Sequence, residues 1–471
     1  MLKKVFQNKV FKNFSYLTIG NSISQFIGFV VMIKIAGIFS PSNYGIYTFL
    51  YTQGLLLMNI GDLGLKNIII RSIARDNSKT KGLISTGIKI KVIAILLLTV
   101  VYTLYNFLWG TLNSTQIILI FSFALISCIT NLLEIVFLGY QKMIVPSVIN
   151  IFGSLIWLFF IFFAPSSVFK DVNTLFLIYT LISLIKVSVY YICIKKQHLD
   201  IGVKADSFFV HAKQLMKESM PYFNLMLLML PIVYLSNNYL QINSTDAEIG
   251  YFNLANKLMM PVTLVLNLAL ASLFPNLSIL WEKDRARFIR RISVGYRIFV
   301  AISLLLAFVF TLFSKDIIDL LLPEDYLNAV EVCQLQIWYV FFMGVNSLIG
   351  TLWGAMNLEK MILKTAIVNT LISTPFLFYG SKYGAFGLSY GYVISFALFE
   401  FYLWYMFKKS IVQKQKNDIG MWLLVAVAFF SSFYFLEALD VIWKLLVMIG
   451  LMGVTSFYLY KKRNQLKLLW A

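Results

Sequence analysis

The residue best suited to binding a charged molecule is Lys186, which lies inside a long apolar stretch from 173 to 194. Tyr179, Ser183 and Tyr190 share its helical face, because successive spacings of four, three and four residues follow the repeat of an α-helix. A lone ammonium in a lipid core costs about 3 kcal/mol or more unless it meets an anion or water. This face is therefore typical of a site that binds an anion beside hydroxyl groups.

Two acidic residues also lie within apolar stretches. Glu400 is well inside the stretch 386–407, and Glu134 lies toward the cytoplasmic end of the stretch 116–139. A structural ion pair between Lys186 and an acid such as Glu400 is the alternative to an anion site. Because intramembrane carboxylates are typical of ion pathways, both glutamates are candidates for ion coupling.

Further polar side chains recur on single faces of other apolar stretches. A polar group in lipid costs roughly 1–3 kcal/mol, so such faces should turn toward other helices or toward a wet cavity. These side chains have two alternative roles, which are hydrogen bonding to neighbouring helices and contact with a substrate. Together with Lys186, Tyr179 and Ser183, the candidate substrate-binding residues are Asn21, Gln25, Asn59, Asp62, Asn224, Asn238, Asn256 and Asn267.

The elements that carry these residues are long apolar stretches, each able to cross a bilayer core about 30 Å thick. The expected fold is an all-α integral membrane protein with about fourteen transmembrane helices. The composition agrees, because 59% of the residues are hydrophobic and 13% are charged, against about 25% charged in soluble domains. The stretches lie near 14–39, 45–65, 83–107, 116–139, 146–165, 173–194, 219–240, 253–280, 294–313, 330–356, 361–380, 386–407, 420–437 and 441–460.

The distribution of basic residues predicts the orientation of the chain. Of the 40 Lys and Arg residues, 33 lie in the two tails or in connections with even numbers, counted from the N-terminus. Because positive charge is retained in the cytoplasm, both termini are expected there. The net charge of +19 is then explained by loops beside anionic lipid headgroups, and no nucleic acid partner is expected.

The connections leave little room for an enzyme. The longest external loop is a short one, near 314–329, and no phosphate-binding GxxxxGK[ST] loop appears. Cys128, Cys193 and Cys333 have no metal-ligand spacing. No catalytic residue, metal or cofactor is expected, so the membrane helices themselves should carry the function.

The chain divides into similar halves. KMIVPSVIN (142–150) and KMILKTAIVN (360–369) occupy corresponding connections. Six stretches in each half predict two six-helix lobes, related by a pseudo-two-fold axis along the membrane normal, with a substrate cavity between them. The expected parts are an N-lobe (1–194), a linker (195–218), a C-lobe (219–410) and two additional C-terminal stretches (411–471).

The linker between the expected lobes has apolar residues at helical spacing. It predicts an amphipathic helix lying at the membrane surface, with Asp206 or Ser207 as the N-cap. An irregular linker is the alternative.

The stretch from Asn13 to Arg75 resembles a known family. Its motifs are the P-x-x-Y-G turn of Pro41, Tyr44 and Gly45 and the D-L-G-L sequence that starts at Asp62. They resemble Wzx-type O-antigen and capsule flippases, in the polysaccharide-transporter branch of the multidrug/oligosaccharidyl-lipid/polysaccharide (MOP) superfamily. Over the whole chain the resemblance extends as topology, with two six-helix lobes and two extra helices.

The resemblance implies a flippase of the bacterial cytoplasmic membrane. Its substrate would be a polyprenyl-pyrophosphate-linked oligosaccharide, moved to the external leaflet by alternating access, and its partners would be membrane lipids and the polysaccharide polymerase machinery. Basic cavity residues would hold the pyrophosphate. No Arg lies inside an apolar stretch, so Lys186, Lys34 and Lys257 are the available cations.

Three alternatives belong to other classes. A cation-coupled multidrug exporter of the same superfamily typically has an acidic residue in its N-lobe, often in the first span, and the first stretch here has none. A membrane glycosyltransferase or polymerase is disfavoured by the short external loops. A structural scaffold would not need polar faces within the membrane.

Overall fold

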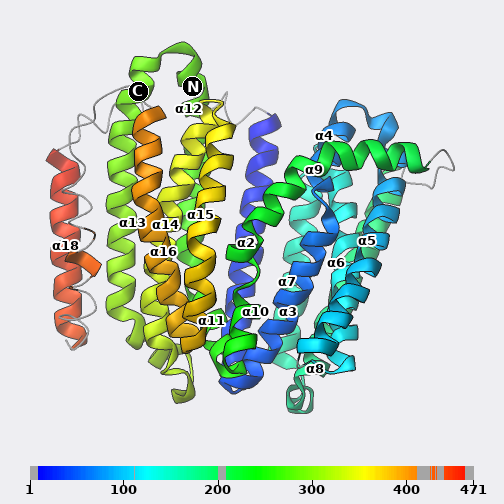
Figure 1. Ribbon diagram of the computed structural model, residues 1–471, viewed down its shortest axis with the longest axis horizontal. Helices are drawn as coiled ribbons and strands as arrows, with labels where there is room; N and C mark the ends of the chain where they lie inside the picture. The colour runs from blue at the N-terminus through cyan, green and yellow to red at the C-terminus, as the bar shows by residue number, and fades with distance from the viewer. Residues whose placement is uncertain are drawn as a thin grey trace. The chain divides into compact units, whose positions relative to one another are not determined.

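The computed structural model describes residues 9–110, 112–199, 208–410 and 440–461, together with Val425, 427–429 and Ser431. These residues form helices and short turns, without any β-strand (Figure 1). The chain separates into two compact units, Met1–Asn237 and Asn238–Ala471. The expected all-α fold is confirmed, whereas the predicted lobe and linker boundaries and the pseudo-two-fold axis remain predictions.

The first unit consists mainly of long helices joined by short turns. Helix α2 packs along α7, while α6 packs against both α3 and α8. The helices are α2 (Lys9–Ile38), α3 (Pro41–Asp62), α4 (Leu65–Arg75), η1 (Asn77–Lys79), α5 (Thr80–Trp109), α6 (Ser114–Gly139), α7 (Ile144–Phe163), η2 (Ser166–Lys170), α8 (Val172–Lys196), α9 (Phe208–Val233) and the start of α10 (Ser236–Asn243).

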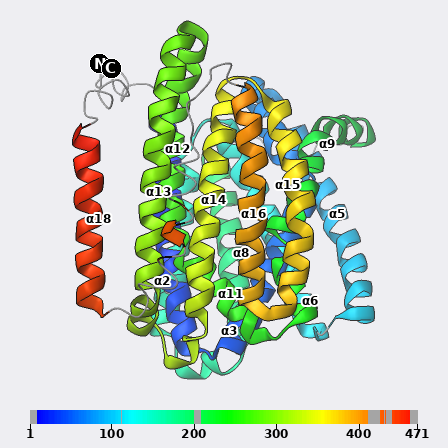
Figure 2. The ribbon, with the colours of Figure 1, turned by 60° about the vertical axis from the view of Figure 1, so that its left-hand side comes forward.

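The second unit has the same character, and Figure 2 shows α13, α14, α16 and α15 standing side by side. The turn from α15 to α16, which is formed by η4, is described further below. The helices are α11 (Asp246–Leu258), α12 (Met260–Lys283), α13 (Arg285–Leu321), η3 (Glu324–Tyr326), α14 (Ala329–Ala355), α15 (Glu359–Gly380), η4 (Ser381–Tyr383), α16 (Gly384–Ser410) and α18 (Val441–Lys461).

The helices follow the apolar stretches of the sequence. Within the described residues, eight helical stretches are long and apolar enough to cross a membrane, or ten when each of two bent pairs is one span. The bent pairs are α9 with α10, at 42°, and α11 with the first part of α12, at 41°. The expected stretch 420–437 lies almost wholly outside the described residues, so the count of fourteen remains a prediction.

The D-L-G-L motif is a sharp break between two helices. Asp62 ends α3, and Leu63 and Gly64 both adopt left-handed backbone conformations, with φ of 51° and 72°. A side chain on Gly64 would lie 2.8 Å from the backbone nitrogen of Phe223 in α9. Because only glycine accepts both the positive φ and this close approach, the motif fixes α4 against α9.

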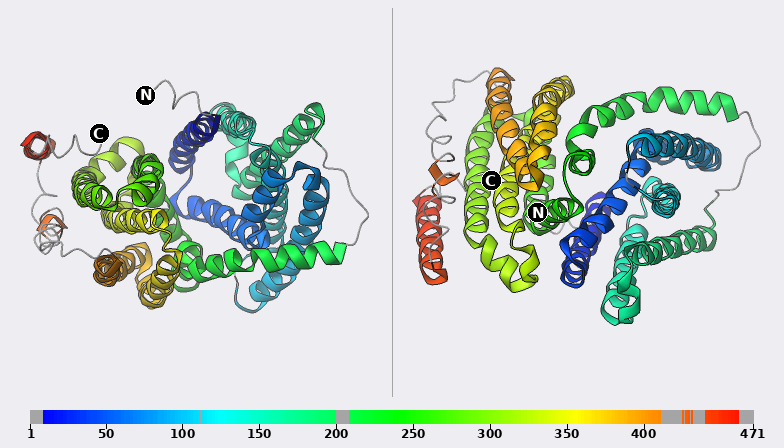
Figure 3. Two further views of the ribbon diagram at one scale, coloured as in Figure 1. Left: turned by 90° about the horizontal axis from the view of Figure 1, so that it is seen from above. Right: turned by 60° about the horizontal axis from the view of Figure 1, so that its bottom comes forward.

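Helix α9 is longer than the expected linker helix. It begins at Phe208 and continues to Val233, with Pro221 and Pro231 inside it. Figures 1 and 3 show that its first part runs across the ends of α4 and α5 and that the helix then turns along the bundle. The amphipathic segment and the next span therefore form one bent helix, and the expected N-caps, Asp206 and Ser207, lie outside the described residues.

The orientation predicted from charge leads to a labelling experiment on a matched pair of exposed serines. Ser167 lies in η2, between α7 and α8, and Ser78 lies in η1. In a variant whose three cysteines are replaced by alanine, Ser167→Cys should react with an impermeant maleimide added to intact cells. Ser78→Cys should react only after the membrane is made permeable, and the reverse pattern would overturn the orientation.

Candidate functional site

The predicted hydroxyl face of α8 lies within a cluster of aromatic rings. The ring of Tyr179 lies 5.0 Å from that of Trp157 (α7), 5.6 Å from that of Phe123 (α6) and 5.7 Å from that of Tyr51 (α3), measured between centroids. Four helices of the first unit therefore meet around the predicted residue, and Ser183 donates to the Tyr179 carbonyl at 3.1 Å.

Lys186 lies beyond this cluster on the same helix. Its aliphatic chain passes directly over Gly153 of α7, where a methyl group on the glycine would collide with it. Glu134 lies in α6, which packs against α8, although no ion pair within 4.0 Å joins Lys186 to another described residue. Of the two predicted glutamates, Glu134 is therefore the one that shares a unit with Lys186.

Several polar atoms beside this face have no hydrogen-bond partner within the described part of the chain. They are the hydroxyls of Tyr47 and Tyr190 and the indole nitrogen of Trp157. Buried polar atoms normally have a partner, so each such atom calls for an explanation. Together with the half-buried Lys186 side chain, these atoms form a set of hydrogen-bond donors on and beside the α8 face.

A buried ion pair lies where α3 and α5 meet. The Lys91 ammonium is 2.6 Å from the Asp62 carboxylate, and the side chains are 2% and 20% exposed. Asp62 also accepts from the backbone N–H of Lys66 at 3.2 Å. The sequence indicated Asp62 as a candidate, whereas Lys91 is one of the 33 basic residues that indicated only the orientation of the chain. The sequence did not show that Lys91 lies opposite the D-L-G-L break, because that position depends on how α5 packs in the tertiary structure.

A polar pocket of about 530 Å³ lies between α4, the start of α5 and the first part of α9. Arg71 and Glu218 form an ion pair across it at 3.4 Å, and Lys79 pairs with Asp76 at the same distance. Arg75 lines the pocket and belongs to neither pair. The sequence did not predict this pocket, because its basic residues indicated only the orientation of the chain.

Local hydrogen bonds keep one carboxylate of this pocket charged. The Ser78 hydroxyl donates to Asp76 at 2.6 Å and its backbone N–H donates at 3.0 Å. These bonds hold the pKa of Asp76 below its ordinary value. The pocket therefore combines fixed negative charge with a larger number of cations.

In the second unit, Glu400 is the most isolated acidic group. It is 2% exposed, and neither carboxylate oxygen has a hydrogen-bond partner among the described residues. The indole nitrogen of Trp404, one turn along α16, also lacks a described partner. Lys257 lies in the last turn of α11. The structure places Glu400 and Lys186 in different units.

The remaining predicted residues are spread over both units. Asn59 donates to the Leu55 carbonyl at 2.8 Å, and the Lys34 ammonium lies 5.6 Å from the centroid of the Phe162 ring. Asn21 and Asn238 are half-buried. The exposed members of the set are Gln25, Asn224, Asn256 and Asn267.

Lys444 lies near the start of the last apolar stretch, 441–460. In the structure it is 3% exposed and forms an ion pair with Asp316 of α13 at 2.8 Å. This pair joins α18 to α13, so the lysine has an internal partner in addition to its place near a helix end.

The overall structure is similar to solved membrane transporters. The chain is 15% identical to a lipid II flippase MurJ in an inward closed conformation, with a TM-score of 0.72, covering 96% of this chain and 99% of that one. An inward-facing multidrug resistance MATE family transporter of the MOP superfamily gives 13% identity, a TM-score of 0.62 and coverage of 82% and 95%. A MATE transporter from Vibrio cholerae is 15% identical, with a TM-score of 0.54, and the match covers 86% of this chain and 97% of that one.

These similarities confirm the expected fold and the multi-pass membrane architecture. The solved structures are those of a flippase and of two transporters. None of the curated proteins matches the sequence closely enough to be a relative. The sequence itself matches the family described as polysaccharide biosynthesis protein over residues 10–281. Since this match spans more than half of the chain, the protein belongs to that polysaccharide biosynthesis family.

Proposed function

We propose that this protein is a Wzx-type flippase, which moves polyprenyl-pyrophosphate-linked oligosaccharide across the bacterial cytoplasmic membrane for assembly of O-antigen or capsule. The observation that carries the proposal is the half-buried Lys186 side chain, which packs over Gly153 among apolar helices on the face that also carries Tyr179 and Ser183. The family match to polysaccharide biosynthesis and the fold shared with a lipid II flippase support it.

The chemistry of such a substrate suits the first unit. A diphosphate forms strong charge-assisted hydrogen bonds with ammonium and guanidinium groups, and a glycan can use the hydroxyl and indole donors of Tyr47, Trp157 and Tyr190. The basic pocket that contains Arg75 offers a place for the headgroup at the end of the bundle predicted to be cytoplasmic. The lipid chain can stay in the bilayer throughout, so only the polar part needs a protein path.

Alternating access would then carry the headgroup between leaflets without nucleotide. Glu134 and Glu400 are the proposed sites of ion coupling, because each is a carboxylate within the apolar helices. Both termini are proposed to be cytoplasmic, and the polymerase that uses the flipped substrate is the proposed downstream partner.

The second candidate function is cation-coupled export of drugs. The buried carboxylate of Glu400 and the similarity to MATE structures favour it. The first helix weakens it, because α2 contains Lys34 and no acidic residue.

The two functions predict different effects of removing the protein. Loss of a flippase should leave lipid-linked oligosaccharide on the cytoplasmic leaflet and lower surface polysaccharide at least tenfold, with unchanged sensitivity to cationic drugs. The measurement is surface glycan, together with access of an external glycosidase to the lipid-linked pool in spheroplasts. Normal surface glycan in a drug-hypersensitive strain would establish the exporter and reject the flippase.

A further inference from the structure

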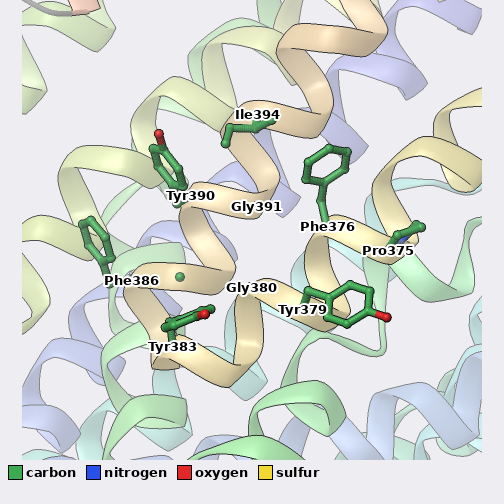
Figure 4. A pocket seen from close by; sticks show the side chains of 10 residues that line it. Pro375, Phe376, Tyr379, Gly380, Tyr383, Phe386, Tyr390, Gly391 and Ile394 are labelled. Atoms are coloured by element: carbon green, nitrogen blue, oxygen red, sulfur yellow. The ribbon is translucent and has the colours of Figure 1, made fainter.

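An apolar groove of about 570 Å³ lies between α15 and α16, next to the turn that joins them. Figure 4 shows Phe376 and Tyr379 projecting from α15 and Phe386 and Tyr390 from α16, with Tyr383 at the turn. These rings are 37–79% exposed. The groove is therefore open to the surroundings of the helices, which in a membrane means the acyl-chain region.

The floor of the groove is formed by glycines at the helix crossing. A side chain on Gly387 would collide with the carbonyl oxygen of Gly380, and one on Gly391 would lie 2.6 Å from the carbonyl oxygen of Phe376. Small residues let two helix backbones approach closely in a membrane. Because the floor has no side chains, the aromatic rings stand above it as walls.

Hydrogen bonds from neighbouring helices hold the turn in place. Glu248 of α11 accepts from the backbone N–H of Ala385 at 2.6 Å, where α16 begins. Asn243 of α10 donates to the Ser381 hydroxyl at 2.8 Å. Between these two contacts, Gly384 has a φ of 71°. The groove is thus preformed, so binding of a ligand would need little free energy to order it.

A cation stands at the end of the groove. The Lys382 ammonium lies 5.2 Å from the centroid of the Tyr379 ring and 6.0 Å from that of Phe378. Lys382 is exposed, and the distribution of basic residues puts its turn on the external side. The site therefore combines apolar walls with one positive charge at the predicted membrane surface.

We propose that this groove holds the isoprenoid chain of a polyprenyl phosphate lipid, with the phosphate at Lys382. In such a lipid the phosphate is bonded directly to a single chain, so a cation at the groove's end meets the phosphate of a chain lying in the groove. A glycerophospholipid has two chains and places glycerol between chain and phosphate. The inference rests on the proposed function, and it adds a binding site for the lipid part of the substrate on the external side.

The chain offers a matched control for a crosslinking experiment. Phe386 and Tyr390 are 43% and 46% exposed, while Phe401 and Tyr405 lie on the same helix with the same spacing and are 66% and 59% exposed. The full-length protein, in phosphatidylcholine nanodiscs, would be photolabelled with a diazirine-bearing polyprenyl monophosphate. Labelled peptides would be identified by mass spectrometry.

Replacing Phe386 and Tyr390 by alanine should lower labelling of residues 375–394 at least fivefold, and replacing Phe401 and Tyr405 should leave it unchanged. Lys382→Gln should lower labelling by polyprenyl phosphate severalfold but not labelling by an uncharged polyprenol. The proposal would be overturned in favour of ordinary lipid contact if both double variants lost labelling equally. The same holds if phosphatidylglycerol competed with the probe as strongly as unlabelled polyprenyl phosphate does.

A flipping assay on the same preparation separates this proposal from the proposed function. Selective labelling in a protein that does not flip lipid-linked oligosaccharide supports the groove and rejects the flippase. Active flipping without selective labelling rejects the groove and leaves the flippase in place.

Discussion

Lys186→Ala is expected to reduce flipping of lipid-linked oligosaccharide roughly 10- to 150-fold while the protein still accumulates in the membrane. A hydrogen bond to a charged group contributes about 1.5–3 kcal/mol, and each 1.4 kcal/mol is about a factor of ten. Lys186→Arg should retain part of the activity, because the charge remains and the donor geometry changes. The measurement is the initial rate of flipping in proteoliposomes, normalised to protein content.

Gly153→Ala tests the position of the ammonium without removing it. The added methyl group would occupy the space of the Lys186 chain, so flipping should fall although the charge remains. Lys170→Ala removes an exposed lysine from η2 of the same unit and should leave the rate unchanged. Wild-type flipping by a well-expressed Lys186→Ala protein would reject the anion site.

A purely structural role for Lys186, as the partner of an acid, predicts a different set of results. If Lys186 and Glu134 serve only as a charge pair, each single neutral variant should lower protein abundance. The double variant, Lys186→Met with Glu134→Gln, should then restore both abundance and flipping. Under the substrate-binding hypothesis the double variant stays inactive, because no cation remains for the diphosphate.

Removing either partner of the Asp62–Lys91 pair is expected to destabilise the protein by about 3–5 kcal/mol, because a buried charge is left uncompensated. Asp62→Asn should have the larger effect, since it leaves the Lys91 ammonium unpaired at 2% exposure. The double variant, Asp62→Asn with Lys91→Met, should recover most of the lost stability. Thermal unfolding of the purified protein in detergent measures all three.

A surface pair provides the control for this cycle. Arg71 and Glu218 are 47% and 38% exposed, and such pairs contribute about 0–1 kcal/mol. Glu218→Gln should therefore shift the unfolding temperature much less than Asp62→Asn. Equal shifts, or no loss in Asp62→Asn, would show that the buried pair does not hold α3 to α5.

The amino-acid sequence determined the all-α class and most of the long helices, because hydrophobic length and helical periodicity are local properties. The spacing of Tyr179, Ser183 and Lys186 likewise placed them on one face of α8. The D-L-G-L motif was recognised as a motif, but its physical reason, two left-handed residues against α9, required the packed structure.

Only the tertiary structure decided which charges meet. Lys91 reads as one more basic loop residue until α5 is packed against α3, where it becomes the buried partner of Asp62. In the same way Glu134, rather than Glu400, proved to share a unit with Lys186. The aromatic groove depends on Gly380, Gly387 and Gly391 facing the neighbouring backbone. Helical periodicity gives the face of each helix, whereas the partner of that face depends on contacts between residues far apart in the chain.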